Sequence, residues 1–253
     1  MDIRFDNKVI VVTGASSGIG KATAIEFAKS GARVVVHYNS NKQGADDVVD
    51  QIDKLGVEVI SVSGDLSKSQ HVDRLIHETM DRFGTIDILI NNAGTLVERR
   101  TIETMDENLW TTVMDVNLTS VYLCCKAVIP IMKEKGFGRI VNLTSVAARN
   151  GGGPGAGHYS TAKAGVLTFT KSLAKELAGT GILVNAVSPG VITTPFHDKY
   201  STHEARKMYA NNTPLKREGT PEEVAYGILF LASEYASFIV GETMEINGGL
   251  LMD

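Results

Sequence analysis

The sequence contains very little cysteine, and the few residues present are not spaced like a disulfide framework. Among 253 residues there are two, Cys124 and Cys125, which are adjacent in an apolar stretch of helical pattern. Neighbouring positions on a helix point in different directions, so we expect two small buried core residues rather than a disulfide. The six histidines are scattered without paired spacing, so no metal site is predicted.

The chain also lacks a basic block, a long apolar run and a leader pattern. Its formal net charge is −4, which argues against nucleic acid or an anionic membrane as a partner. Its wholly apolar runs are far shorter than a membrane span. Residues 1–8 are mostly polar and show no signal-peptide pattern. We therefore expect a cytoplasmic protein with no nucleic-acid or membrane partner.

What the sequence does contain is a regular alternation of short apolar runs and longer amphipathic segments. The expected strands are residues 9–12, 34–37, 57–62, 86–90, 139–145, 182–187 and 239–246. The expected helices are residues 20–30, 44–55, 70–83, 107–132, 159–177 and 221–231. Such alternation predicts an α/β fold, a doubly wound parallel sheet with helices on both faces. Because the sequence contains no linker and no internal repeat, we expect one domain over residues 1–253.

A glycine-rich segment joins the first expected strand to the first expected helix. It reads Thr-Gly-Ala-Ser-Ser-Gly-Ile-Gly over residues 13–20. Glycines permit a tight turn and a close approach of backbone to a ligand, and the helix start offers free N–H groups and the positive end of its dipole. Placed after a strand and before a helix, the segment predicts a pyrophosphate site, although an ordinary strand–helix turn is the alternative.

Three further motifs follow in order along the chain: Asn-Asn-Ala-Gly at residues 91–94, Tyr-Ser-Thr-Ala-Lys at residues 159–163 and Ser-Pro-Gly at residues 188–190. With the spacing Gly-x-x-x-Gly-x-Gly at Gly14, Gly18 and Gly20, the set closely resembles the short-chain dehydrogenase/reductase family. The resemblance extends over the whole chain to Asn-Gly-Gly at residues 247–249. It implies a Rossmann-type fold and an NAD(P)(H)-dependent oxidoreductase that interconverts a carbonyl and a secondary alcohol. It also implies a homotetramer, assembled through residues 107–132, 159–177 and the C-terminal strand region.

The resemblance assigns many residues to the cofactor. They are Gly14, Ser16, Ser17, Gly18, Ile19, Gly20, Tyr38, Asn39, Ser40, Asp65, Leu66, Asn91, Ala93, Gly94, Tyr159, Lys163, Pro189, Gly190, Ile192 and Thr194. Asp65 has an alternative role at the start of the following helix.

The choice of nicotinamide depends on the end of the second strand, where an acidic residue would repel a 2′-phosphate. Tyr38 stands where members of the family that prefer NAD carry Asp, and Asn39 and Ser40 follow it. The sequence therefore favours NADP(H), with NAD(H) or dual use as the alternative.

Tyr159 and Lys163 are four residues apart, so they share one face of a helix. A free tyrosine titrates near ~10, and a nearby ammonium favours tyrosinate, which predicts an acid/base pair. Ser145 lies fourteen residues earlier, at the end of a strand, and its hydroxyl could bind the substrate oxygen. The resemblance adds Asn117 as a fourth member that anchors a water chain to the lysine. Its alternative is a helix-interior polar residue satisfied by backbone.

The expected substrate loops are unusually polar. Arg99, Arg149 and Asn150 are candidate substrate residues, and the cations of the two arginines predict a carboxylate-bearing, sugar-acid-like substrate. Solvated or structural arginines are the alternative. Within the family, the rival substrate is a 3-oxoacyl group on an acidic carrier protein, for which Lys133 and Lys135 are the available cations. A catalytically silent NAD(P)-sensing protein is the alternative of a different class.

Overall fold

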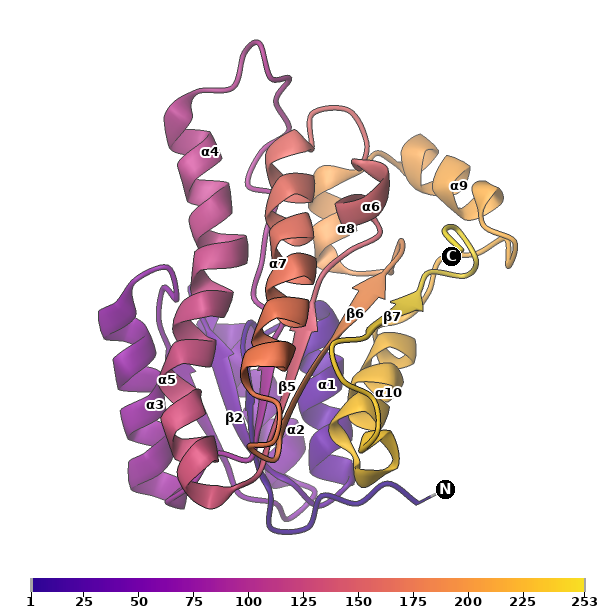
Figure 1. The fold of residues 1–253 in the computed structure, drawn as a ribbon. Coiled ribbons are helices and arrows are strands. Elements are labelled where there is room, and N and C mark those ends of the chain that lie inside the picture. The colour runs from indigo at the N-terminus through magenta and orange to yellow at the C-terminus, as the bar shows by residue number, and fades with distance from the viewer. Residues whose placement is uncertain (1, 253) are drawn as a thin grey trace.

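The computed structural model describes residues 2–252, which form a seven-stranded, all-parallel sheet. The strands are β1 (Val9–Val12), β2 (Arg33–Tyr38), β3 (Val59–Ser63), β4 (Ile88–Asn91), β5 (Gly138–Leu143), β6 (Ile182–Pro189) and β7 (Thr243–Ile246). Their order across the sheet is β3-β2-β1-β4-β5-β6-β7. This arrangement confirms the predicted Rossmann-type α/β fold (Figure 1).

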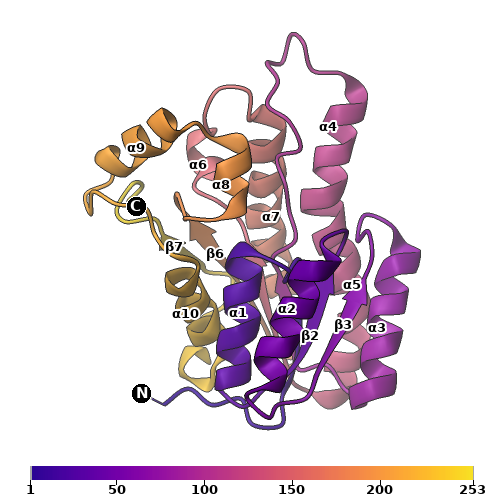
Figure 2. The same ribbon diagram turned by 180° about the vertical axis from the view of Figure 1, so that it is seen from behind.

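Helices cover both faces of this sheet. They are α1 (Gly18–Lys29), α2 (Lys42–Asp53), α3 (Ser69–Phe83), α4 (Glu107–Met114), α5 (Ser120–Lys135), α6 (Ala147–Asn150), α7 (Gly157–Glu176), α8 (Pro195–Tyr200), α9 (His203–Asn212) and α10 (Pro221–Ala232), with short turns η1 (Asp115–Thr119) and η2 (Glu234–Ala236). Helices α3, α5 and α7 lie on one face, and α1, α2 and α10 lie on the other (Figures 1 and 2).

The strands are apolar on both sides because both faces are covered. In β1, Val9 and Val11 pack into the core beneath α3, α5 and α7, whereas Ile10 and Val12 pack into the core beneath α1, α2 and α10. All four side chains are fully buried. A β-strand presents successive side chains to opposite faces, so a continuous β-branched run is what a doubly covered central strand requires.

The expected helix over residues 107–132 is one helical run with a π-helical turn at its centre, η1. Within residues 2–252 it is the one helix long and apolar enough to cross a membrane by length and composition. Its side chains Cys124, Cys125 and Val128 are buried against the sheet. The two cysteines are unpaired core residues, as predicted.

Most element boundaries match the sequence prediction within about three residues, and two regions differ more. The last strand, expected over residues 239–246, is shortened to β7 because residues 239–242 are irregular, with a bend at Gly241, whose φ is +72°. Helices α8 and α9 follow β6 in a segment for which the sequence predicted no helix. Both helices lie above the carboxyl ends of the strands (Figure 1).

The strand order changes direction between β1 and β4, so their following segments leave toward opposite faces of the sheet. In open α/β sheets this divergence creates a crevice at the carboxyl ends of the strands, where ligands bind. The glycine-rich segment follows β1, and residues 92–95 follow β4. The fold therefore brings two of the motifs together at this crevice.

At the opposite edge, Asp87 anchors the amino ends of the strands. Its carboxylate is fully buried, accepts a hydrogen bond from Val9 N–H at 2.9 Å and pairs with the ammonium of Lys135.

Asp87→Ala leaves the Val9 N–H without its partner, so it should lower the free energy of unfolding by about 1–3 kcal/mol in urea denaturation. The control Asp6→Ala removes an exposed pair with Arg4 and should leave the midpoint unchanged. Equal midpoints for the two variants would contradict this account.

Candidate active site

A cavity of about 710 Å³ lies at the carboxyl ends of the strands. Its walls come from the glycine-rich segment, the segments that follow β2, β4, β5 and β6, the start of α7, and helices α8 and α9. Predicted residues in its lining are Gly14, Ser16, Ser17, Gly18, Ile19, Asn39, Ser40, Ala93, Gly94, Arg99, Ser145, Asn150, Tyr159, Lys163, Pro189, Gly190, Ile192 and Thr194. The cavity thus unites residues from four separate motifs.

The glycine-rich segment fits an anionic phosphate group. Gly14 and Gly18 have φ values of +64° and +54°, and a Cβ on Gly14 would lie 2.9 Å from the Cα of Ala93. Ser17, the residue just before helix α1, is extended, and its side chain makes no capping bond to the helix. The first turn of α1 carries no acidic residue. The first N–H groups of α1 and the positive end of its dipole therefore face a cavity that a pyrophosphate could occupy.

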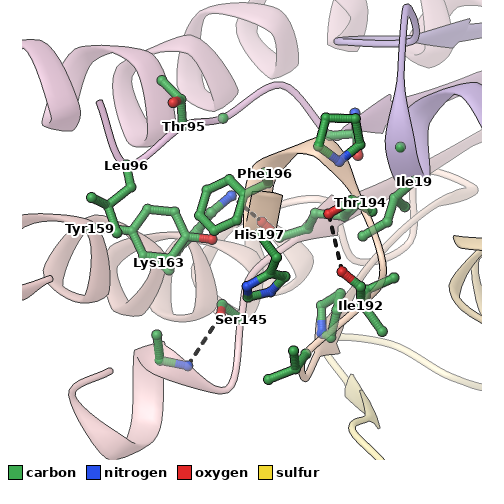
Figure 3. Close-up of a pocket in the computed structure, with 18 of the residues that line it drawn as sticks. Ile19, Thr95, Leu96, Ser145, Tyr159, Lys163, Ile192, Thr194, Phe196 and His197 are labelled. Atoms are coloured by element: carbon green, nitrogen blue, oxygen red, sulfur yellow. Dashed lines mark hydrogen bonds between the residues drawn. The ribbon is translucent and has the colours of Figure 1, made fainter. Parts of the chain in front are cut away.

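Three side chains form a reactive group on one side of the cavity, with Phe196 and His197 of α8 beside them (Figure 3). Tyr159 and Lys163 lie one turn apart on α7, with the lysine Nζ 5.8 Å from the centre of the tyrosine ring. Lys163 is buried, and its ammonium donates a hydrogen bond to the Leu143 carbonyl at 2.8 Å. Ser145 follows β5, and its Oγ accepts a hydrogen bond from Ala147 N–H at 3.1 Å.

Burial dominates the acid–base properties of this group. It raises the pKa of Tyr159 to about 12, and hydrogen bonding with Ser145 opposes that rise. It lowers the pKa of Lys163 to about 8, because an ammonium loses hydration in the interior. The sequence predicted that the lysine would lower the tyrosine pKa, but the pKa is raised by burial, and the group that opposes this rise is Ser145. Tyr159 therefore holds its proton at neutral pH and can act as a proton donor.

Asn117 does not line the cavity but fixes the segment that follows β4. It lies in the π-turn η1, where its Oδ1 accepts a hydrogen bond from Thr95 N–H at 3.1 Å and its Nδ2 donates to the Thr95 carbonyl at 2.7 Å. Its amide also donates to the Val113 carbonyl at 2.8 Å. A Cβ on Gly94 would come within 2.7 Å of Asn117 Oδ1 and 3.2 Å of Lys163 Nζ. Gly94 therefore lets the asparagine and the lysine lie close to this segment.

Several residues that the resemblance assigned to the cofactor do not line the cavity. Asn91 points into the core, where its amide donates a hydrogen bond to Asn142 Oδ1 at 2.8 Å. The Asp65 carboxylate accepts from Ser67 N–H at 3.0 Å in the loop before α3, whose N-cap Lys68 has no side-chain capping bond, and Leu66 is buried. Tyr38 and Gly20 are also absent from the lining among residues 2–252. Instead of Asn91, its neighbour Asn92 lines the cavity beside Ala93.

The candidate substrate arginines are engaged with the protein itself. Arg149 pairs with Glu245 at 3.2 Å. Arg99 lines the cavity, but its Nε donates to the Tyr200 carbonyl at 2.8 Å and its Nη1 to the Pro154 carbonyl at 3.0 Å. Asn150 lines the cavity and accepts a hydrogen bond from Gly152 N–H. The two arginines therefore do not converge on one anion-binding point.

Arg99 instead belongs to a set of contacts that hold α8 over the cavity. The Thr95 hydroxyl and the Tyr200 phenol share a hydrogen bond of 2.7 Å, and the Tyr200 ring packs on Phe196 with centroids 5.0 Å apart. Phe196 in turn packs against Tyr159 at 5.6 Å. Val97 adopts the left-handed region, with φ of +64°, and this strained turn brings Thr95 and Arg99 to the same helix.

Helices α8 and α9 form a lid over the cavity, and the sequence did not predict the side chains that they contribute. Phe196, His197 and Tyr209 line the cavity, and so does Leu250 from the C-terminal segment. The signal for them is weak, because α8 and α9 have no strong apolar periodicity. His158, which precedes Tyr159 in the chain, is fully buried and bonds the Glu98 carbonyl at 3.0 Å.

Comparison with known proteins agrees with this geometry over the whole chain. The family model described as enoyl-(acyl-carrier-protein) reductase matches residues 14–251. A protein of Synechocystis named 3-oxoacyl-[acyl-carrier-protein] reductase is 46% identical over 250 residues, which is 97% of each chain. Reductases of the same name from Staphylococcus epidermidis and Staphylococcus aureus are 39% and 38% identical, over 97% of this chain and 100% and 98% of theirs. The chain belongs to the short-chain dehydrogenase/reductase family of nicotinamide-dependent oxidoreductases acting on carbonyl and alcohol groups.

Proposed function

We propose that this protein is a 3-oxoacyl-[acyl-carrier-protein] reductase that uses NADP(H). The observation that carries the proposal is the 46% identity, over 97% of both chains, with a protein of that name. The cavity agrees with an acyl substrate, because its lining includes the side chains of Phe196 and Tyr209 from the lid and of Leu250 from the C-terminal segment. A sugar-acid substrate, which the sequence favoured, has no support from the relatives, and its two candidate arginines are engaged in contacts with the protein.

In the proposed reaction the hydroxyls of Ser145 and Tyr159 orient the substrate carbonyl by hydrogen bonding to its oxygen. The nicotinamide, when bound, supplies the hydride that reduces the carbonyl carbon. Tyr159 donates its proton to the oxygen, which completes the secondary alcohol. Lys163, held by the Leu143 carbonyl with its ammonium 5.8 Å from the centre of the tyrosine ring, stabilises the tyrosinate left behind. Asn117 acts as a positioning residue for the segment at Gly94.

The preference for NADP(H) rests on the absence of negative charge at the end of β2. Asn39 and Ser40 line this part of the cavity, and neither carries a carboxylate that would repel a 2′-phosphate. Lys42 is the nearest cation in sequence, but its ammonium bonds Asp46 at 2.6 Å. The pocket is therefore neutral, and we expect a modest preference that leaves NAD(H) usable.

We also propose that the protein is a homotetramer, as the family resemblance implies. Trp110 of α4 and Tyr122 of α5 are partly exposed on the helices expected to form an interface. Near the C-terminal strand, Phe238 is fully exposed. Large aromatic side chains at these two places are typical of surfaces that become buried on association.

The substrate proposal is tested by the rate of NADPH oxidation with an acetoacetyl thioester and, separately, with a uronate-derived α-keto sugar acid. We expect turnover of the thioester, and preference for the sugar acid would contradict the proposal. Tyr159→Phe should lower the thioester rate on the order of 10²–10⁴-fold, because the proton donor is lost. The matched control Tyr226→Phe alters an exposed tyrosine and should leave the rate unchanged. Cofactor binding with no turnover of any carbonyl would favour the nucleotide-sensing alternative.

The role of Arg99 is tested by Arg99→Ala. If the guanidinium holds α8 over the cavity, its loss should lower kcat/KM for every substrate by a similar factor, about tenfold. The matched control is Arg100→Ala, because Arg100 is exposed and pairs with Glu98. A loss confined to carboxylate-bearing substrates would instead support the anion-binding role that the sequence suggested.

The rate of reduction should also depend on the protonation of Lys163. Below a pKa of about 8 the side chain is a cation that stabilises the forming tyrosinate, and above it the side chain is neutral. We therefore expect kcat for reduction to fall as pH rises through about 8. The measurement is a profile of kcat from pH 6 to 10. Lys163→Arg keeps its charge over this range, so its residual activity should show no fall near pH 8. A wild-type profile that is flat to pH 10 would exclude this role.

A further inference from the structure

One buried titratable group beside the cavity has no part in the proposed reaction. His37 lies near the end of β2, and only 2% of its surface is exposed. Its Nδ1 bonds the backbone N–H of Gly14 at 3.1 Å, and its Nε2 bonds the Gly64 carbonyl at 2.9 Å. The imidazole therefore joins the glycine-rich segment to the end of β3, and it also forms part of the cavity wall.

The two partners determine which ring nitrogen carries the proton. A backbone N–H can only donate, so Nδ1 must accept from Gly14. A carbonyl can only accept, so Nε2 must carry the hydrogen that is donated to Gly64. One neutral tautomer satisfies both bonds, and the imidazolium does not, because it would set a second N–H against that of Gly14.

The burial of the ring keeps it in this neutral form. Burial lowers the pKa of His37 to about 4, and it outweighs the bond to Gly64, which acts in the opposite direction. Two charged groups face the ring from neighbouring elements. Arg74 of α3 lowers the pKa further, and Asp65, after β3, raises it.

The Gly14 N–H belongs to the Thr13–Gly14 peptide, which is also held at its carbonyl. The Thr13 carbonyl accepts a hydrogen bond from Asn92 Nδ2 at 2.8 Å. The next peptide is held as well, because the Gly14 carbonyl accepts from Asn92 Nδ2 at 3.0 Å and the Ala15 N–H donates to the His37 carbonyl at 2.7 Å. The left-handed conformation of Gly14 turns the chain toward the start of α1. His37 and Asn92 therefore fix the two peptides that lead into the start of α1.

We propose that His37 is a positioning residue for the dinucleotide, whose Nδ1 fixes the Gly14 peptide so that the glycine-rich segment is preorganised for the pyrophosphate. This inference rests on the proposed cofactor site. Its consequence is that the bond to Gly14 governs cofactor affinity, whereas the bond to Gly64 contributes only to the stability of the fold.

Two amide variants separate the two bonds. In His37→Asn the amide oxygen takes the position of Nδ1 and can accept from Gly14, while the bond to Gly64 is lost. In His37→Gln the amide nitrogen takes the position of Nε2 and can donate to Gly64, while the bond to Gly14 is lost. Each variant loses one hydrogen bond, so the two should be destabilised to a similar extent in thermal unfolding.

The measurement is the Kd of NADPH and of NADH by isothermal titration at pH 7, without a carbonyl substrate. We expect His37→Asn to bind within about threefold of the wild-type protein and His37→Gln to bind about tenfold more weakly, because an N–H in the segment is left without its acceptor. Equal Kd values for the two variants, or weaker binding by His37→Asn, would overturn the positioning role alone. Failure of the wild-type protein to bind either dinucleotide would overturn the proposed function, and the role of His37 with it.

A pH series gives a second readout that a merely structural residue would not change. Protonation of His37 as the pH falls through about 4 should weaken cofactor binding in the wild-type protein and have no counterpart in His37→Asn, which has no titrating group at this position. The series uses NADP⁺, because the reduced dinucleotide decays in acid, and the ratio of the two Kd values removes the titration of the dinucleotide itself. A ratio that stays constant from pH 7 to pH 3.5 would contradict the proposal.

Discussion

The backbone polar groups at the carboxyl edge of the sheet need hydrogen-bond partners in a place that must also stay open to a ligand. Short polar side chains meet this constraint. Thr13 Oγ1 accepts from the N–H groups of Asn92 and Ala93, at 2.9 and 3.0 Å, and so ties the end of β1 to the segment after β4. The Asn91 amide continues the network through Asn142 to Thr170 on α7. With these groups satisfied inside the protein, the start of α1 is left to face the cavity.

The same edge sets the properties of the reactive side chains. Lys163 reaches back from α7 to the last carbonyl of β5, that of Leu143, and the Thr144 hydroxyl returns a bond to the Lys163 carbonyl at 2.9 Å. Strand and helix are therefore locked together where the ammonium is buried. Burial moves the two pKa values in opposite directions, up for Tyr159 and down for Lys163. A neutral phenol beside a lysine that titrates near pH 8 is suited to giving a proton to a carbonyl oxygen.

The sequence predicted those parts of the molecule that depend on local pattern. The β-branched runs predicted the strands of the sheet, and the glycines that end helices predicted most helix boundaries. The motifs predicted many of the residues that line the cavity. The prediction was less accurate for the direction in which an individual side chain points. Asn91 and Asn92 are adjacent, yet Asn91 points into the core and Asn92 toward the cavity, because successive positions at a strand end face opposite sides. Arg149 and Glu245 are 96 residues apart, and nothing in the sequence near either residue indicates that they pair.

Most of the polar side chains around the cavity bond to backbone rather than to another charge. Arg99 donates to the carbonyls of Tyr200 and Pro154, and His158 bonds that of Glu98. Asn117 likewise bonds the backbone of Thr95, and His37 bonds the backbone N–H of Gly14. A backbone partner occupies a polar side chain and fixes the path of a loop, so a loop rich in arginine and histidine need not be a polar binding surface. Selectivity for the substrate then falls to the side chains that remain directed into the cavity, and on the lid side these include the rings of Phe196 and Tyr209.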